Sequence, residues 1–144
     1  MRQMPSTRSA MTPFPHFIEA GDTLLEARAL MVEHRIRHLP VQEDGVLVGI
    51  LTDRDLKRAF DPALGLPPKQ ELFVSDVYVP GAYVVSGDAP LDAVLDHMAT
   101  HHIGSALVTK GDKLVGIFTA TDACRQFCDH LRSVHGRGDS DDVA

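Results

Sequence analysis

Two short stretches of the chain carry residues whose types and spacing suit the binding of a nucleotide. Residues 49–55 (GILTDRD) and 116–122 (GIFTATD) both run glycine, two apolar residues, threonine, two other residues, aspartate. A threonine at a helix start places its hydroxyl beside unpaired backbone N–H groups, which favour phosphate. An aspartate three residues later can accept hydrogen bonds from two neighbouring hydroxyls, as acidic residues do toward ribose. The pattern predicts two sites, at Thr52 with Asp55 and at Thr119 with Asp122.

A structural role is the alternative for each stretch. Threonine followed three residues later by an acidic residue also forms a capping box, in which the two side chains satisfy backbone N–H groups at a helix start. One isolated copy would favour that explanation. Two copies in matched register, 67 positions apart, favour a duplicated binding unit instead.

The residues inside the two motifs differ. Arg54 lies between the threonine and the aspartate of the first copy, where it could contact phosphate or remain a solvated surface charge. Thr121 holds the equivalent position in the second copy and offers only a hydroxyl. Both alternatives stay open for Arg54.

The elements that position the first motif can be read from hydrophobic spacing. Apolar residues recur at helical intervals from Thr23 to about Arg35, which predicts an amphipathic helix. Residues 38–41 and 46–51 flank Asp44-Gly45, a dipeptide typical of hairpin turns, and the second strand is apolar enough to predict burial on both faces. Thr52 then caps a short helix to about Phe60.

The same order repeats in the second part of the chain, which predicts an α+β fold of two β-α-β-β-α repeats. An offset of 67 relates Met31 to Met98 and Gly49 to Gly116, whereas Gly21-Asp22 against Gly87-Asp88 indicates an offset of 66 before the first helix. We therefore expect that one residue was gained or lost at that helix start. The expected organisation is a flexible arm (1–8), repeat 1 (9–61), a linker (62–73), repeat 2 (74–132) and a disordered tail (133–144).

Composition limits the classes of function. The chain has 144 residues, 44% of them hydrophobic, and a formal net charge of −6. A negative charge opposes general nucleic-acid binding. No apolar run approaches the roughly 20 residues that span a bilayer, and residues 1–8 lack an apolar signal-peptide segment. We expect a cytoplasmic protein with no membrane partner.

Metal binding and catalysis find little support in the sequence. Cys124 and Cys128 lie four apart on a predicted helix, where we expect buried, reduced thiols. His97 and His101 have the spacing of a helical metal pair, but the glutamate of a catalytic zinc motif is absent, and we expect both rings to be exposed. No nucleophile elbow, phosphate loop or dinucleotide glycine fingerprint occurs, so we expect neither a metal site nor an enzyme.

The first half contains the segment RHLPVQEDGVLVGILTDRD, and the second contains IGSALVTKGDKLVGIFTATD. With these segments the two halves resemble the cystathionine beta-synthase (CBS) domain family across about residues 9–132. The resemblance implies two repeats related by a pseudo-two-fold axis, with adenosine-containing ligands in clefts between them. It also implies that each cleft combines the Thr-x-x-Asp of one copy with the strand start of the other. The implied ligand-binding residues are Thr52, Arg54, Asp55, Ile103, Gly104 and Ser105 for one cleft and Thr119, Thr121, Asp122, Ile36, Arg37 and His38 for the other.

These assignments predict two unequal sites. Arg37 and His38 would serve the site of Asp122, whereas that of Asp55 would rely on Arg54 alone, so we expect tighter phosphate binding at Asp122. If His38 takes part, affinity there should rise as the pH falls from about 7.5 toward 6.

The function that we expect is regulatory binding of an adenine nucleotide (AMP, ADP or ATP) or S-adenosylmethionine, with no cofactor required. The signal would pass through the shape of a homodimer or to a regulated protein partner that the sequence does not identify. Two alternatives remain. One is a structural interaction module without a nucleotide. The other is a nucleic-acid-binding protein that uses the basic residues Arg35, Arg37, Arg54, Lys57 and Arg58.

Overall fold

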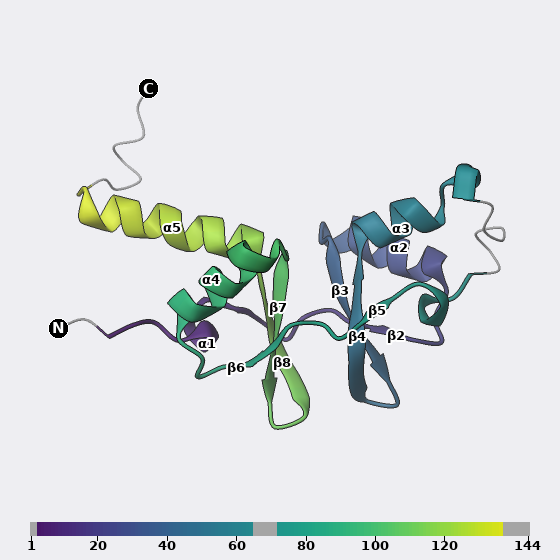
Figure 1. The fold of residues 1–144 in the computed structure, drawn as a ribbon, viewed down its shortest axis with the longest axis horizontal. Coiled ribbons are helices and arrows are strands. Elements are labelled where there is room, and N and C mark those ends of the chain that lie inside the picture. Colours follow the sequence, from purple (N-terminus) through teal and green to yellow (C-terminus); the bar gives the residue numbers. More distant parts are fainter. Residues whose placement is uncertain (1–2, 65–71, 137–144) are drawn as a thin grey trace.

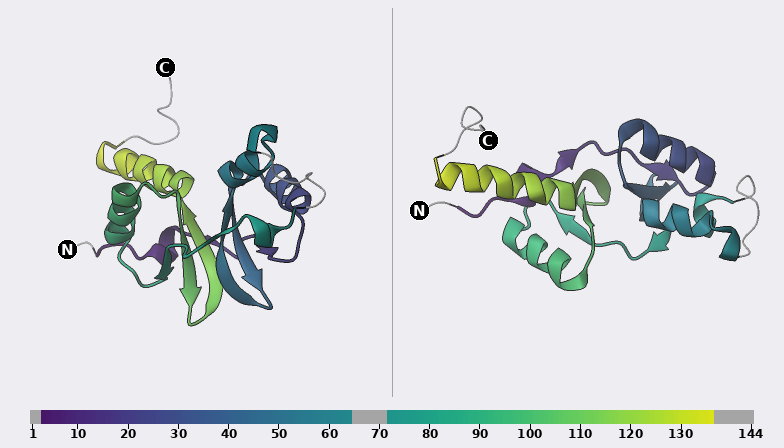
Figure 2. Two further views of the ribbon diagram at one scale, coloured as in Figure 1. Left: turned by 45° about the vertical axis from the view of Figure 1, so that its right-hand side comes forward. Right: turned by 90° about the horizontal axis from the view of Figure 1, so that it is seen from above.

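The fold pairs two four-stranded sheets, each covered by helices (Figure 1). It is seen in a computed structural model that describes residues 3–64 and 72–136. Within these residues one sheet has the strand order β2-β3-β4-β5 and the other β1-β8-β7-β6. The predicted α+β class is confirmed. The two sheets lie side by side and contact each other through β4 and β8 (Figure 2).

The first half of the chain runs through α1 (Thr7–Ala10), β1 (Thr12–Pro13), β2 (Ile18–Glu19), α2 (Leu24–His34), β3 (His38–Glu43), β4 (Val46–Thr52), α3 (Asp53–Ala59) and the short 3-10 helix η1 (Pro62–Leu64). The second half runs through the 3-10 helix η3 (Val74–Asp76), β5 (Val79–Pro80), β6 (Val84–Ser86), α4 (Leu91–His101), β7 (Ser105–Lys110), β8 (Lys113–Thr119) and α5 (Ala120–Val134).

A constant offset of 67 relates the two halves, including the segments before the first helix. The helix N-caps are Thr23 and Pro90, and β1 and β5 begin at the equivalent residues Thr12 and Val79. The expectation of a gained or lost residue is therefore wrong. It arose because Gly21-Asp22 and Gly87-Asp88 look alike in sequence without being equivalent in the fold.

Each half is completed by the segment that precedes the other half. Strand β1 pairs with β8 of the second sheet, and β5 pairs with β4 of the first. The backbone N–H of Thr7 donates to Ala89 O at 2.9 Å, and that of the equivalent Val74 donates to Asp22 O at 2.8 Å. We call residues 5–13 and 72–80 the crossing segments.

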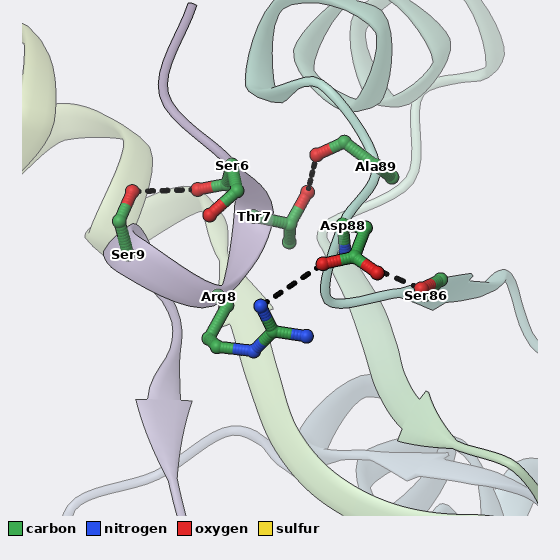
Figure 3. Close-up of polar contacts among 7 residues, drawn as sticks. All are labelled: Ser6, Thr7, Arg8, Ser9, Ser86, Asp88 and Ala89. Carbon is green, nitrogen blue, oxygen red and sulfur yellow. Dashed lines mark hydrogen bonds and ion pairs between the residues drawn. The ribbon is translucent and has the colours of Figure 1, made fainter.

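The flexible arm predicted for residues 1–8 does not fit the crossing segment at the start of the chain. The Thr7 side chain is fully buried and donates to Ala89 O at 2.8 Å, and Arg8 pairs with Asp88 at 3.0 Å (Figure 3). These contacts are long-range in sequence, so a polar, Pro-containing stretch gave no sign of them.

The predicted linker and tail also overlap folded structure. Leu72, placed in the linker 62–73, is buried in the core of the first half, whereas residues 65–71 lie outside the described residues. Helix α5 continues through Val134, so the tail predicted from 133 begins inside a helix. Its part from residue 137 onward lies outside the described residues.

The two halves have separate hydrophobic cores, each formed by a helix stripe against a sheet. Leu24, Ala27 and Met31 of α2 pack in the first, and Leu91, Val94 and Met98 of α4 pack in the second. The prediction that the second hairpin strand is buried on both faces is wrong for β4, because Val46 is 59% exposed while Leu51 is fully buried. The turn end of the hairpin projects away from the helices (Figure 1).

Among the described helices, none combines the length and apolar character that crossing a bilayer requires.

Candidate functional site

Two cavities lie where the halves meet, and each is lined by residues of both. The first, with a volume of about 670 Å³, contains Thr52 and Asp55 and is called the Asp55 pocket. The second, about 690 Å³, contains Thr119 and Asp122 and is called the Asp122 pocket. Both volumes fall in the range of roughly 300–1,000 Å³ that is usual for small-molecule sites.

The structure brings the predicted site residues together at these two cavities. Those lining the Asp55 pocket are Thr52, Arg54, Asp55, Ile103, Gly104 and Ser105. Those lining the Asp122 pocket are Thr119, Thr121, Asp122, Ile36, Arg37 and His38. Each cavity thus combines the Thr-x-x-Asp motif of one half with the strand start of the other.

Capping boxes fix the threonine and aspartate at the start of α3. Asp55 Oδ2 accepts hydrogen bonds from the backbone N–H of Thr52 at 2.9 Å and from its hydroxyl at 3.0 Å, and Thr52 Oγ1 accepts from the backbone N–H of Asp55 at 3.3 Å. The structural alternative for the motif is therefore present. It occupies only one carboxylate oxygen, because within the part of the chain that the structure describes Asp55 Oδ1 has no hydrogen-bond partner.

The second capping box differs in one contact. Asp122 Oδ2 accepts from the backbone N–H of Thr119 at 2.9 Å and from its hydroxyl at 3.1 Å, as in the first half. In addition, Asp122 Oδ1 accepts a hydrogen bond from Thr12 Oγ1 at 3.2 Å. The residue equivalent to Thr12 in the other half is Val79, which lines the Asp55 pocket and cannot donate from its side chain. The carboxylate of Asp122 is therefore more fully engaged than that of Asp55.

Arg37 and His38 lie between the two cavities and line both. The premise that the Asp55 pocket relies on Arg54 alone is therefore wrong. It failed because the strand starts of both halves meet at the centre of the molecule, so one side chain can face two cavities. An arginine here can form charge-assisted, bidentate hydrogen bonds with an anion from either side.

The surroundings of His38 favour the neutral form of its imidazole. Burial lowers the pKa of its imidazole, the charge of Arg37 lowers it further, and Asp53 and Asp55 oppose these effects. Its Nδ1 is buried without a hydrogen-bond partner among the described residues. A lowered pKa opposes the gain of charge at His38 on which the expected rise in affinity between about pH 7.5 and 6 depends.

Two aromatic residues that the sequence reasoning missed also line the cavities. Tyr83 lines the Asp55 pocket and stacks on His97 with ring centroids 4.0 Å apart. His16 lines the Asp122 pocket and stacks on His34 at 3.7 Å. Their equivalence at the offset of 67 is the signal that could have identified them. The expected exposure of His97 is wrong, because its ring is half-buried between Tyr83 and His101.

The cysteines lie away from both cavities on α5. Cys124 and Cys128 are free and exposed, so the prediction of buried thiols is wrong. The reason is that α5 extends beyond the sheet (Figure 1) and none of its described residues is buried. Over residues 3–64 and 72–136, no group of three or more histidine, cysteine, aspartate or glutamate side chains is placed to hold a metal ion.

Comparison with known proteins agrees with this architecture. The family model for the CBS domain matches the chain twice, over residues 8–62 and 74–129. The CBS domain-containing protein YhcV of Bacillus subtilis is 32% identical over 123 residues, which cover 83% of each chain. The crystal structure of the Vibrio cholerae protein AcuB superposes with a TM-score of 0.79 at 29% identity, covering 94% of this chain and 99% of AcuB.

A further solved structure contains a ligand. CBSX2 in complex with AMP has a TM-score of 0.76 and 26% identity, with 89% of this chain and 99% of CBSX2 covered. The paired sheets, the 67-residue repeat and the two family matches lead to one assignment: this chain belongs to the CBS-domain family and carries two CBS domains in tandem.

Proposed function

We propose that this CBS-domain pair binds an adenosine-containing ligand in the Asp55 and Asp122 pockets and serves as a regulatory module. The observation that carries the proposal is the composition of each cavity, which joins a Thr-x-x-Asp motif to the strand start of the other half. The similarity to CBSX2, which was solved with AMP, supports this ligand class.

The residues suit the parts of a nucleotide. Asp55 Oδ1 can accept hydrogen bonds from ribose hydroxyls. Arg37 and Arg54 can hold a phosphate in the Asp55 pocket, and Arg35 and Arg37 can do so in the Asp122 pocket. AMP, ADP, ATP and S-adenosylmethionine all present ribose hydroxyls. They differ in the charge of the group that the arginines would contact.

Regulation follows from where the cavities lie. A ligand that contacts both halves stabilises one relative placement of them, and it can signal only if its affinity differs between two such placements. We expect a homodimer to transmit the change through α5, which exposes Phe127, Leu131 and Val134. A regulated partner protein would be a second route.

A structural module without a ligand is the second candidate. The capping boxes favour it, because Thr52 with Asp55 and Thr119 with Asp122 already satisfy each other. The two candidates differ in whether the carboxylates also contact a ligand.

Calorimetric titration with AMP, ATP and S-adenosylmethionine separates these candidates. Asp55→Ala and Asp122→Ala should each weaken binding at one pocket by about 1.5–3 kcal/mol, the usual worth of hydrogen bonds to a charged group. Glu26→Ala is the matched control, because it removes the capping box of Thr23 on α2 and lies in neither pocket. If the double aspartate variant binds as the parent does, the pockets are not the site.

A further inference from the structure

His16 and Tyr83 hold equivalent places in the two halves. Each lies between the first two strands of its half, two residues after a residue in the left-handed region, Phe14 with φ 49° or Gly81 with φ 74°. His16 lines the Asp122 pocket and Tyr83 lines the Asp55 pocket. The fold therefore supplies one planar ring to each cavity from the same position.

Each ring stacks on a histidine of a packed helix, and neither histidine lines the cavity concerned. His16 and His34 are nearly parallel, with an interplanar angle of 15°, and Tyr83 and His97 make an angle of 22°. His97 in turn stacks on His101, the equivalent of His34, at 4.1 Å. Because buried stripes hold α2 and α4 in the two cores, the helix backbone that carries these histidines is fixed.

The backbone also holds Tyr83 in place at the Asp55 pocket. The carbonyl of Tyr83 accepts a hydrogen bond from the backbone N–H of Leu107 at 2.9 Å, and Leu107 is fully buried in β7. A ring that is ordered before the ligand arrives loses little conformational freedom on binding.

We propose that Tyr83 and His16 are base platforms, on which the base of the ligand stacks in the Asp55 and Asp122 pockets respectively. This inference rests on the proposed function and adds to it the residue in each pocket that selects for a planar base. An aromatic side chain can stack on any of the bases, and such stacking contributes substantially to binding affinity. The Asp55 pocket offers a phenol and the Asp122 pocket an imidazole, so the larger ring should hold a base more firmly.

The test compares AMP with ribose 5-phosphate, which has the same sugar and phosphate without the base. Tyr83→Leu and Tyr83→Phe are made in the Asp122→Ala background, so that binding reports the Asp55 pocket. Tyr83→Leu should weaken AMP binding by roughly 5- to 150-fold, the range found for loss of a stacked base contact, and leave ribose 5-phosphate unchanged. Tyr83→Phe, which keeps the ring, should bind both as its background does.

His16→Leu and His16→Phe in the Asp55→Ala background provide the matching pair for the Asp122 pocket. If the leucine variants lose affinity equally for AMP and ribose 5-phosphate, the ring has only a structural role and the proposal of base platforms is overturned. The proposal is also overturned if the leucine variants bind AMP as tightly as their backgrounds do. Failure of the parent chain to bind AMP, ATP and S-adenosylmethionine would instead overturn the proposed function.

A spectroscopic readout checks stacking directly. The chain contains no tryptophan, so Tyr83→Trp introduces its one indole. Addition of AMP should quench the fluorescence of this variant, and saturating ribose 5-phosphate should not. Equal quenching by both ligands would contradict contact between the base and residue 83.

Discussion

The imidazole ring of His38 lies against Gly104, so that a methyl group added at Gly104 would stand 3.0 Å from Cε1 and 3.3 Å from Nε2. The two residues come from different halves, and both line the Asp55 pocket. The strand starts can approach this closely because one of them carries no side chain at the point of contact. The space for a ligand and the packing of the two halves therefore both depend on the contact between His38 and Gly104.

Gly104→Ala should force His38 to move. We expect an unfolding free energy lower by about 1–3 kcal/mol, the usual cost of overpacking, and weaker ligand binding in the Asp55 pocket. Gly21→Ala is the control, because a Cβ there meets nothing within 4 Å. Calorimetry and thermal unfolding measure both effects. Unchanged binding in the alanine variant would show that the contact of Gly104 with His38 does not shape the pocket.

The lowered pKa of His38 predicts how stability depends on pH. Burial favours the neutral ring, so the folded state binds fewer protons at this site than the unfolded state, whose pKa is about 6.5. The contribution of His38 to stability should be constant above about pH 6.5 and fall as the pH drops below it. Unfolding of the parent and of His38→Gln between pH 8 and 5 measures this, and the parent should lose more stability on acidification. Parallel curves would contradict the prediction.

Equivalent glycines in β4 and β8 should respond differently to alanine. A Cβ at Gly49 would collide with the backbone carbonyl of Val79 and the ring of Tyr78, whereas the three atoms nearest to one at Gly116 all belong to the flexible side chain of Met11. Because backbone cannot move aside cheaply, we expect Gly49→Ala to cost about 3 kcal/mol and Gly116→Ala about 1 kcal/mol. Denaturant titration of both variants measures their unfolding free energies. Equal losses of stability in the two variants would contradict the prediction.

The exposed apolar face of α5 predicts self-association. Phe127 is 61% exposed on a helix with no buried residue among those described, an arrangement that favours burial against a second chain. Light scattering at micromolar concentration should show a dimer for the parent and a monomer for Phe127→Glu. Val46→Glu, at the exposed hairpin end, controls for the added charge and should leave the dimer intact. A monomeric parent, with and without nucleotide, would rule this interface out.

Local patterns in the sequence were enough to predict helices α2, α3, α4 and α5, the two hairpins, and the caps at Thr52 and Thr119. Thr52 and Thr119 cap their helices as the spacing to the aspartates indicated, and Asp44-Gly45 adopts the positive φ values of a hairpin turn. These features depend on residues close together in sequence, which is why one chain suffices to predict them.

Features that depend on distant contacts were not predictable. The crossing segments pair through two-residue strands, which carry almost no hydrophobic period, and Thr7 gave no sign that it is buried against Ala89. The stacking of His16 and Tyr83 was missed for the same reason, since each ring contacts a ring on a helix elsewhere, and only the shared offset of 67 links the two positions in sequence. Arg37 faces two cavities only because the halves meet there.

The crossing segments also limit how much of the protein can fold while it is being synthesised. Residues 5–13 are synthesised before the other elements of the pair, yet β1 pairs with β8, which precedes only α5 among them. The first half cannot close until residues 72–80 have emerged to supply β5. Contacts between residues far apart in sequence slow folding, and domains usually fold in the order of their synthesis. Here neither half can be finished before the other has begun, so the pair should fold as one cooperative unit after translation of β8.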